Sequence, residues 1–169
     1  MTNGTIDPEV RPAGTVTSFV GVGSNVGDRA AHMAFAFDAL ERAPGIRMIR
    51  RSTIHETAPV GPSGQGPYLN AVVELAVSLS PLELLATLLD IERVRGRDRA
   101  NEVRFGPRTL DLDVLTWGAA EPGGARIDSP GLVVPHPRMH DRAFVLVPLA
   151  ELDAGIARRA ASSAVHFDR

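Results

Sequence analysis

Two aspartates in one apolar run are the residues best suited to chemistry in this sequence. Asp111 and Asp113 stand two residues apart within the stretch 109–117, and alternate residues of a β-strand lie on the same face of a sheet. Mg²⁺ takes oxygen ligands and usually binds through one or two carboxylates together with phosphates and water. Two solvated acids on an ordinary strand are the alternative, but aspartate is depleted in strands. The pair therefore indicates a site for a divalent cation.

A cluster of arginines comes directly before the aspartates. Guanidinium groups suit phosphate because they donate two parallel hydrogen bonds. The cluster comprises Arg93, Arg95, Arg97, Arg99, Arg104 and Arg108. A solvated helix end and loop is the better explanation for Arg93 and Arg95, whereas Arg108 adjoins the aspartate strand. Acids that hold a cation beside arginines that hold phosphate predict chemistry on a nucleotide.

Four further side chains are candidates for the same site. Glu92 falls on the apolar stripe of an expected helix, so its carboxylate needs a partner, either a nearby arginine or a nucleotide hydroxyl. His136 stands between two prolines, in a stiff turn. Tyr68 and Phe144 either pack in the core or hold a flat heterocycle between them.

The composition excludes several classes of protein. The chain has 169 residues, 44% of them hydrophobic, and a net charge of −2, which is typical of one globular domain and not of a disordered or membrane protein. A charge near neutral also argues against broad binding of nucleic acid. All 18 basic residues are arginines, so the chain has no Walker A loop, which requires a lysine.

The sequence also indicates a compartment. There is no cysteine, which excludes disulfides and thiolate metal sites and fits a reducing environment. We find neither an apolar stretch as long as a membrane span nor a signal-peptide pattern at the N-terminus. We therefore expect a cytoplasmic protein that does not associate with membranes.

Hydrophobic periodicity and turn residues predict the elements that position these side chains. Asp28 is an expected N-cap for a helix that stops at Pro44, and Ser80 starts a second helix with a capping box. That second helix is expected to bury Leu82, Leu85 and Leu89 and to end at Gly96. The expected strands are 15–23, one within 46–57, 68–77, 109–117 and 143–149, and the expected loops are 58–67, 97–108 and 118–131.

The order of these elements predicts an α+β fold with a ferredoxin-like βαββαβ core, whose antiparallel sheet carries both helices on one face. Alternation along the aspartate strand directs Leu110, Leu112 and Val114 toward the helices and both aspartates toward the other face. Tyr68 and Asn70 join them there. We expect an active site on that open face, in a single domain over residues 15–169, preceded by a flexible extension over residues 1–14.

Several segments, taken in order, resemble the 6-hydroxymethyl-7,8-dihydropterin pyrophosphokinase family of folate biosynthesis. The block Gly-Pro-Arg-Thr-Leu-Asp-Leu-Asp over residues 106–113 is the most specific of them, and the resemblance covers about residues 16–150. The matching segments are Gly23–Asn25 with Gly27–Arg29, Glu56–Gly61, Gln65 with Tyr68–Asn70, Ile91–Glu92 with Gly96–Arg97, Phe105–Val114, Pro135–Met139, and Arg142–Leu146 with Pro148–Leu149.

The resemblance implies transfer of pyrophosphate from ATP to the pterin hydroxymethyl group, with release of AMP. It implies two Mg²⁺ ions held by Asp111 and Asp113, with Arg97 and Arg108 as further catalytic residues. The implied pterin-binding residues are Thr57, Ala58, Val60, Tyr68, Asn70, Phe105 and Phe144. The implied ATP-binding residues are Glu92, Arg97, Arg99, Arg108, Val114, His136 and Arg142. The expected partners are ATP and the pterin, without nucleic acid, for a protein that is a monomer or a weak dimer.

Some positions depart from the family's better-known pattern. Phe105 stands where many members have tryptophan, and Gly131 stands where some members carry an arginine toward ATP. Pro137 replaces an aromatic residue that some members have. The alternative function is a ferredoxin-like module that binds pterin or nucleotide without catalysis, against which the intact pair of aspartates argues. A nucleic-acid-binding module, which depends only on the arginine loop, is a weaker alternative.

Overall fold

The fold is seen in a computed structural model that describes residues 12–60, 63–97, 106–118 and 124–162. Most of the extension expected over residues 1–14, and most of the arginine loop expected over residues 97–108, lie outside these ranges. No helix within the described ranges has the length and apolar character needed to cross a lipid bilayer.

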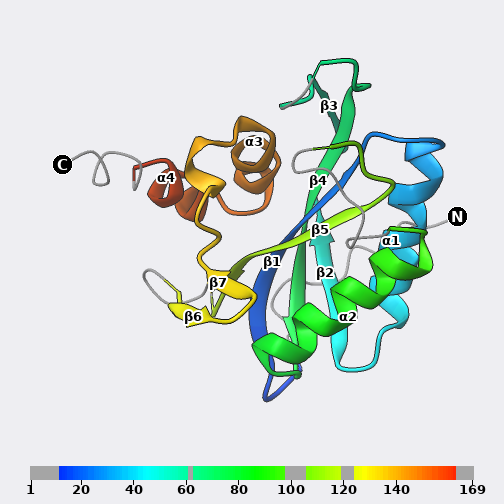
Figure 1. Cartoon of the computed structure of the whole chain (residues 1–169). Coiled ribbons are helices and arrows are strands. Elements are labelled where there is room, and N and C mark those ends of the chain that lie inside the picture. Colours follow the sequence, from blue (N-terminus) through cyan, green and yellow to red (C-terminus); the bar gives the residue numbers. More distant parts are fainter. Residues whose placement is uncertain (1–11, 61–62, 98–105, 119–123, 163–169) are drawn as a thin grey trace, which may run out of the picture.

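A five-stranded sheet forms the centre of the molecule (Figure 1). Its strands lie in the order β2-β4-β1-β5, with β3 also paired to β4, and all of these pairs are antiparallel. The antiparallel α+β architecture expected from the sequence is confirmed. The strands are β1 (Val16–Ser24), β2 (Ile46–Arg51), β3 (His55–Thr57), β4 (Tyr68–Val77) and β5 (Asp111–Trp117). A separate hairpin is formed by β6 (Ile127–Ser129), which lies in the segment 118–131 expected to be a loop, and β7 (Leu132–Val134), which follows it.

Two helices, α1 (Arg29–Arg42) and α2 (Pro81–Val94), lie on one face of the sheet. Both start where the sequence predicts. The Asp28 carboxylate accepts a hydrogen bond from the Ala31 amide, and Ser80 forms a full capping box with Glu83. Leu110, Leu112 and Val114 face these helices in the main core, as expected.

The buried stripe expected for α2 is wrong. Leu84, Leu88 and Ile91 are the buried apolar residues of this helix, whereas Leu82 is exposed. Leucines stand on both sides of α2, so two stripes have helical spacing, and only the sheet decides which of them is buried. Glu92 is buried as well, although the Leu85–Leu89 stripe on which it is expected is not the buried one.

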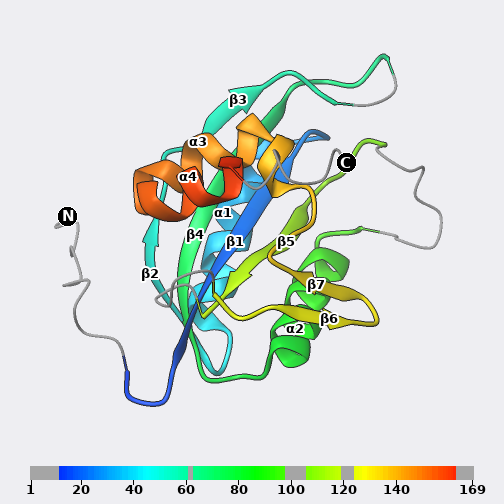
Figure 2. The same ribbon diagram turned by 90° about the vertical axis from the view of Figure 1, so that its left-hand side faces the viewer.

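The opposite face of the sheet is only partly open. The helices α3 (Ala143–Leu152) and α4 (Ala154–Ser162) cover part of it, together with the 3-10 helix η1 (Met139–Asp141) (Figure 2). The strand expected at residues 143–149 is therefore wrong, because a short apolar run fits a buried helix as well as a buried strand. These helices bury Phe19, Val72 and Leu115 in a second core. Two helices therefore occupy part of the face on which the active site is expected. The site is confined to one end of the sheet.

Candidate active site

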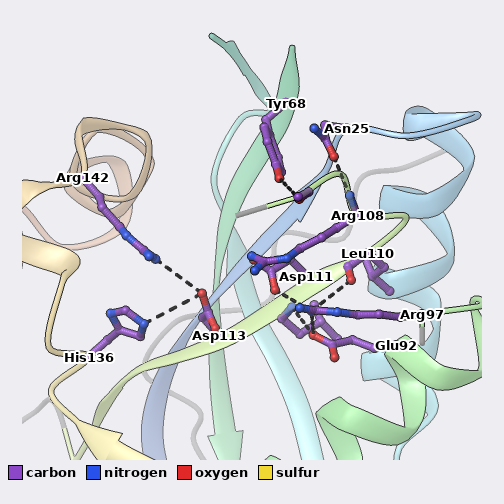
Figure 3. Close-up of polar contacts among 12 residues, drawn as sticks. Asn25, Tyr68, Glu92, Arg97, Arg108, Leu110, Asp111, Asp113, His136 and Arg142 are labelled. Carbon is purple, nitrogen blue, oxygen red and sulfur yellow. Dashed lines mark hydrogen bonds and ion pairs between the residues drawn. The ribbon is translucent and has the colours of Figure 1, made fainter. Parts of the chain in front are cut away.

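The two aspartates of β5 project from the sheet face that carries α3 and α4 (Figure 3). Asp111 lies opposite Gly23 of β1, and Asp113 lies opposite Gly21. A Cβ atom at Gly23 would stand 3.1 Å from Oδ1 of Asn70, a contact that would force the amide aside. Glycine at this position therefore lets the side chains of β4 and β5 approach each other across β1.

Asp111 is held by two arginines. Nη1 of Arg97 lies 2.5 Å from its Oδ1, and Nη1 of Arg108 lies 2.8 Å from its Oδ2. Nη1 of Arg97 also donates to Oε1 of Glu92 at 2.6 Å, and the same oxygen accepts the Leu112 amide at 2.7 Å. The side chains of Glu92 and Arg97 are only 1% and 3% exposed. A buried chain of charges thus fixes the first aspartate from below (Figure 3).

Asp113 faces the turn and helix on the other side of the site. Its Oδ2 lies 3.6 Å from Nη1 of Arg142 and 3.9 Å from Nε2 of His136. Burial, followed by the charge of Asp111, raises the pKa of Asp113 to about 6, although the three arginines oppose this shift. Burial and the neighbouring Arg142 lower the pKa of His136 to about 4, so this imidazole is neutral at pH 7.

The titration of Asp113 gives a first prediction. We expect its carboxyl to titrate near pH 6 in the metal-free protein, because burial beside a second carboxylate disfavours the charged form. The folded state then holds this proton more tightly than the unfolded chain. The stability that the group contributes is present below its ordinary pKa and is lost as the pH rises through 6. Carboxyl ¹³C NMR, assigned with Asp113→Asn, measures the titration, and a midpoint near 4 would contradict the prediction.

A cavity of about 160 Å³ opens beside Asp111. Six of the seven predicted pterin-binding residues meet there, and the seventh, Phe105, lies outside the described residues. Within it, Nδ2 of Asn70 donates to Oγ1 of Thr57 at 2.8 Å, and the Tyr68 hydroxyl donates to the Gly106 carbonyl at 3.3 Å. Its walls are Thr57, Ala58, Val60, Tyr68, Asn70, Arg108, Asp111, Arg138, Asp141, Arg142 and Phe144.

The predicted ATP-binding residues are brought together less completely. Arg108 and Arg142 line the cavity, and His136 lies beside Asp113. Glu92 and Arg97 lie beneath Asp111, whereas the side chain of Val114 is in the main core. Arg99 lies outside the described residues.

Three residues of this site were given no role by the sequence. Asn25 accepts the Arg108 amide through Oδ1 at 2.7 Å and donates from Nδ2 to Oε1 of Gln65 at 3.1 Å. It therefore joins the segments on either side of the cavity. Arg138 and Asp141 line the cavity from the turn before α3. Asn25 and Arg138 belong to segments that resemble the family, and this resemblance could have indicated that both residues are part of the site.

The aspartates fit a magnesium ion that is shared with phosphate. The described residues contain no group of three or more histidine, cysteine or acidic side chains that would hold an ion alone. Mg²⁺ does not require such a group, since one or two carboxylates and substrate phosphates suffice. Burial, and next the charge of Asp111, raises the pKa of Asp113, and a bound cation would favour the charged form of this carboxyl. Together with the arginines, the site can hold a polyphosphate beside a pocket for a flat ring.

Comparisons with known proteins find relatives of this chain. A bacterial enzyme named 2-amino-4-hydroxy-6-hydroxymethyldihydropteridine pyrophosphokinase, from Bacillus subtilis, is 41% identical over 86% of this chain and 83% of its own length. A protein of the same name from Methylorubrum extorquens is 44% identical over 80% of this chain and 81% of its own.

A solved structure and a family model extend these comparisons. The structure titled "Crystal Structure Analysis of the HPPK-DHPS in complex with substrates" has a similar fold, with a TM-score of 0.58 at 13% identity. The match covers 82% of this chain and 40% of that one. Residues 19–154 match the model of the 7,8-dihydro-6-hydroxymethylpterin-pyrophosphokinase family. The chain therefore belongs to the 7,8-dihydro-6-hydroxymethylpterin-pyrophosphokinase family.

Proposed function

We propose that this protein transfers pyrophosphate from ATP to the hydroxymethyl group of 6-hydroxymethyl-7,8-dihydropterin, giving the pterin diphosphate and AMP for folate biosynthesis. Membership of the family and the names of the relatives support this activity. The observation that carries it is the meeting of Asp111 with six predicted pterin-binding residues at one cavity. The proposed phosphate-binding site therefore adjoins the proposed pterin-binding site at this cavity.

The residues of the cavity suit the two substrates. Tyr68 and Phe144 offer apolar surfaces for the pterin ring, while Asn70 and Thr57 offer hydrogen-bonding groups for its edge. Arg108 and Arg142 face the position where the phosphates would lie, and their charges stabilise the negative charge of the transferred group. Transfers of this kind depend mainly on positioning and electrostatics. A strong general base is therefore not required.

Asp111 and Asp113 would hold the Mg²⁺ that accompanies ATP, and we propose that two Mg²⁺ ions bind there. When bound, Mg²⁺ neutralises the polyphosphate and makes the phosphorus more electrophilic. The buried Arg97 fixes the orientation of Asp111 by donating a hydrogen bond to one oxygen of its carboxylate. His136, neutral at pH 7, can donate a hydrogen bond near Asp113 without adding charge, because its Nδ1 accepts the Arg138 amide.

We also propose that the core is the ferredoxin-like βαββαβ arrangement, as a single domain over residues 15–169. The strand order β2-β4-β1-β5, with α1 after β1 and α2 after β4, supports this description. The cytoplasmic location and the monomer or weak dimer remain predictions from the sequence.

A product assay tests the proposed function. The protein with Mg·ATP and 6-hydroxymethyl-7,8-dihydropterin should form AMP and the pterin diphosphate in equal amounts, because the bond between the α- and β-phosphates of ATP is the one that breaks. A reaction without the pterin is the control and should leave ATP intact. Formation of ADP, or no consumption of ATP, would contradict the proposal. Binding of both substrates without turnover would instead support the non-catalytic alternative.

A further inference from the structure

A second cavity, of about 450 Å³, lies next to the candidate active site. Its walls come from β5, from the β6–β7 hairpin with the turn that follows it, from η1 and from α4. The β6–β7 hairpin lies beside β5, below α3 and α4 in the view of Figure 1. Of the described residues that are assigned to the pterin or ATP, only His136 lines it. The volume is in the range of pockets that hold small organic molecules.

The ionisable side chains around this cavity are all basic, and its two arginines carry positive charge. Arg126, His136, His140 and Arg159 line it, and no aspartate or glutamate does so among the residues that the structure describes. Arg126 makes no ion pair or hydrogen bond with any other residue in the described ranges. A cavity with basic side chains and without acids is complementary to an anion.

The rest of the wall is apolar. Val133 is 44% exposed and presents its side chain to the cavity, and the almost fully buried Met139 and Ile156 also belong to its wall. Pro135 and Pro137 add rigid apolar surface from the turn. An inorganic anion would leave this surface in contact with water, whereas a ligand with an apolar body would cover it.

We propose that this cavity binds a small organic anion, with its apolar body on Val133, Pro135 and Pro137 and its negative group near Arg126. The cavity borders the candidate metal site, because His136 forms part of its wall and lies 3.9 Å from Asp113. A ligand in this cavity would therefore be separated from the candidate metal site only by the side chain of His136. The proposal does not depend on the proposed function, and its test does not use turnover.

The probe is 8-anilinonaphthalene-1-sulfonate, which combines an apolar aromatic body with one negative group and fluoresces when removed from water. We expect saturable binding at one site per folded chain. Arg126→Ala should weaken this binding about tenfold, the loss expected for one charge-assisted hydrogen bond. Arg158→Ala is the matched control, because Arg158 is exposed on α4 and does not line the cavity. This control should bind within about twofold of the unmodified protein.

Three results would overturn the proposal. The first is the absence of saturable binding to the folded protein. The second is an equal loss in Arg126→Ala and Arg158→Ala, which would show attraction to overall positive charge. The third is a loss in Arg108→Ala with none in Arg126→Ala, which would place the probe in the active-site cavity. Arg126 is exposed, so its substitution should leave thermal unfolding unchanged, and this measurement confirms that each variant is folded.

Discussion

Replacement of Asp113 by asparagine is expected to remove turnover without weakening the fold. Asparagine keeps the shape of the side chain but loses the charge that a cation requires, so we expect kcat to fall by roughly 10³-fold or more, about 4 kcal/mol of transition-state stabilisation. In the metal-free protein at pH 7 the ionised carboxyl is held against its raised pKa. The variant should therefore be more stable than the unmodified protein, by about 1 kcal/mol, since Asp113 is 36% exposed and partly screened.

The pH dependence of this difference tests its cause. Because the folded state of the unmodified protein binds the proton more tightly, the advantage of Asp113→Asn should shrink as the pH falls through 6 toward 4. Thermal unfolding without metal measures the stability, and release of AMP measures the turnover. Asp128→Asn, at an exposed acid of β6, is the control and should change neither. Near-native activity of Asp113→Asn would remove this residue from the proposed metal site.

Local signals predicted the parts of the fold that depend on neighbouring residues. The Asp28 cap and the Ser80 capping box are complete within four residues, so the sequence alone locates both helix starts. Alternation in β5 likewise separated Asp111 and Asp113 from the core residues between and beside them. Helix caps and strict alternation need only a few consecutive residues, and for these the sequence was sufficient.

Features that depend on distant segments could not be predicted in this way. The run 143–149 is apolar all round, and its helical state follows from packing on Val72 and Leu115, which are remote in sequence. The role of Asn25 depends on hydrogen bonds to Gln65 and Arg108, which fall in two loops whose approach no local pattern encodes. The sequence left two partners open for Glu92, an arginine and a nucleotide hydroxyl. The structure shows the arginine, Arg97.

Glu92 is expected to support catalysis through Arg97 and to be essential for stability. Glu92→Ala would leave the buried Arg97 without one of its acids and the Leu112 amide without its acceptor. We expect a loss of about 3–5 kcal/mol in the free energy of unfolding, the range for breaking a buried ion pair. Glu92→Gln keeps an acceptor for Leu112 but removes the charge, so it should cost less and remain folded. Chemical denaturation measures both losses.

The kinetics of Glu92→Gln separate the two possible partners. The carboxylate is expected to act by fixing Arg97, which in turn orients Asp111. In that case kcat should fall about tenfold or more while the KM for ATP stays within about twofold, because the variant misaligns Asp111 without weakening the binding of ATP. A direct contact with ATP would instead raise the KM for ATP by more than about twofold. Asp90→Asn is the control on the same helix, since the Asp90–Arg93 pair is exposed at 69% and 74%. Such a surface pair contributes about 0.5 kcal/mol or less, so this control should match the unmodified protein in both measurements, and a comparable loss in it would contradict the buried-pair explanation.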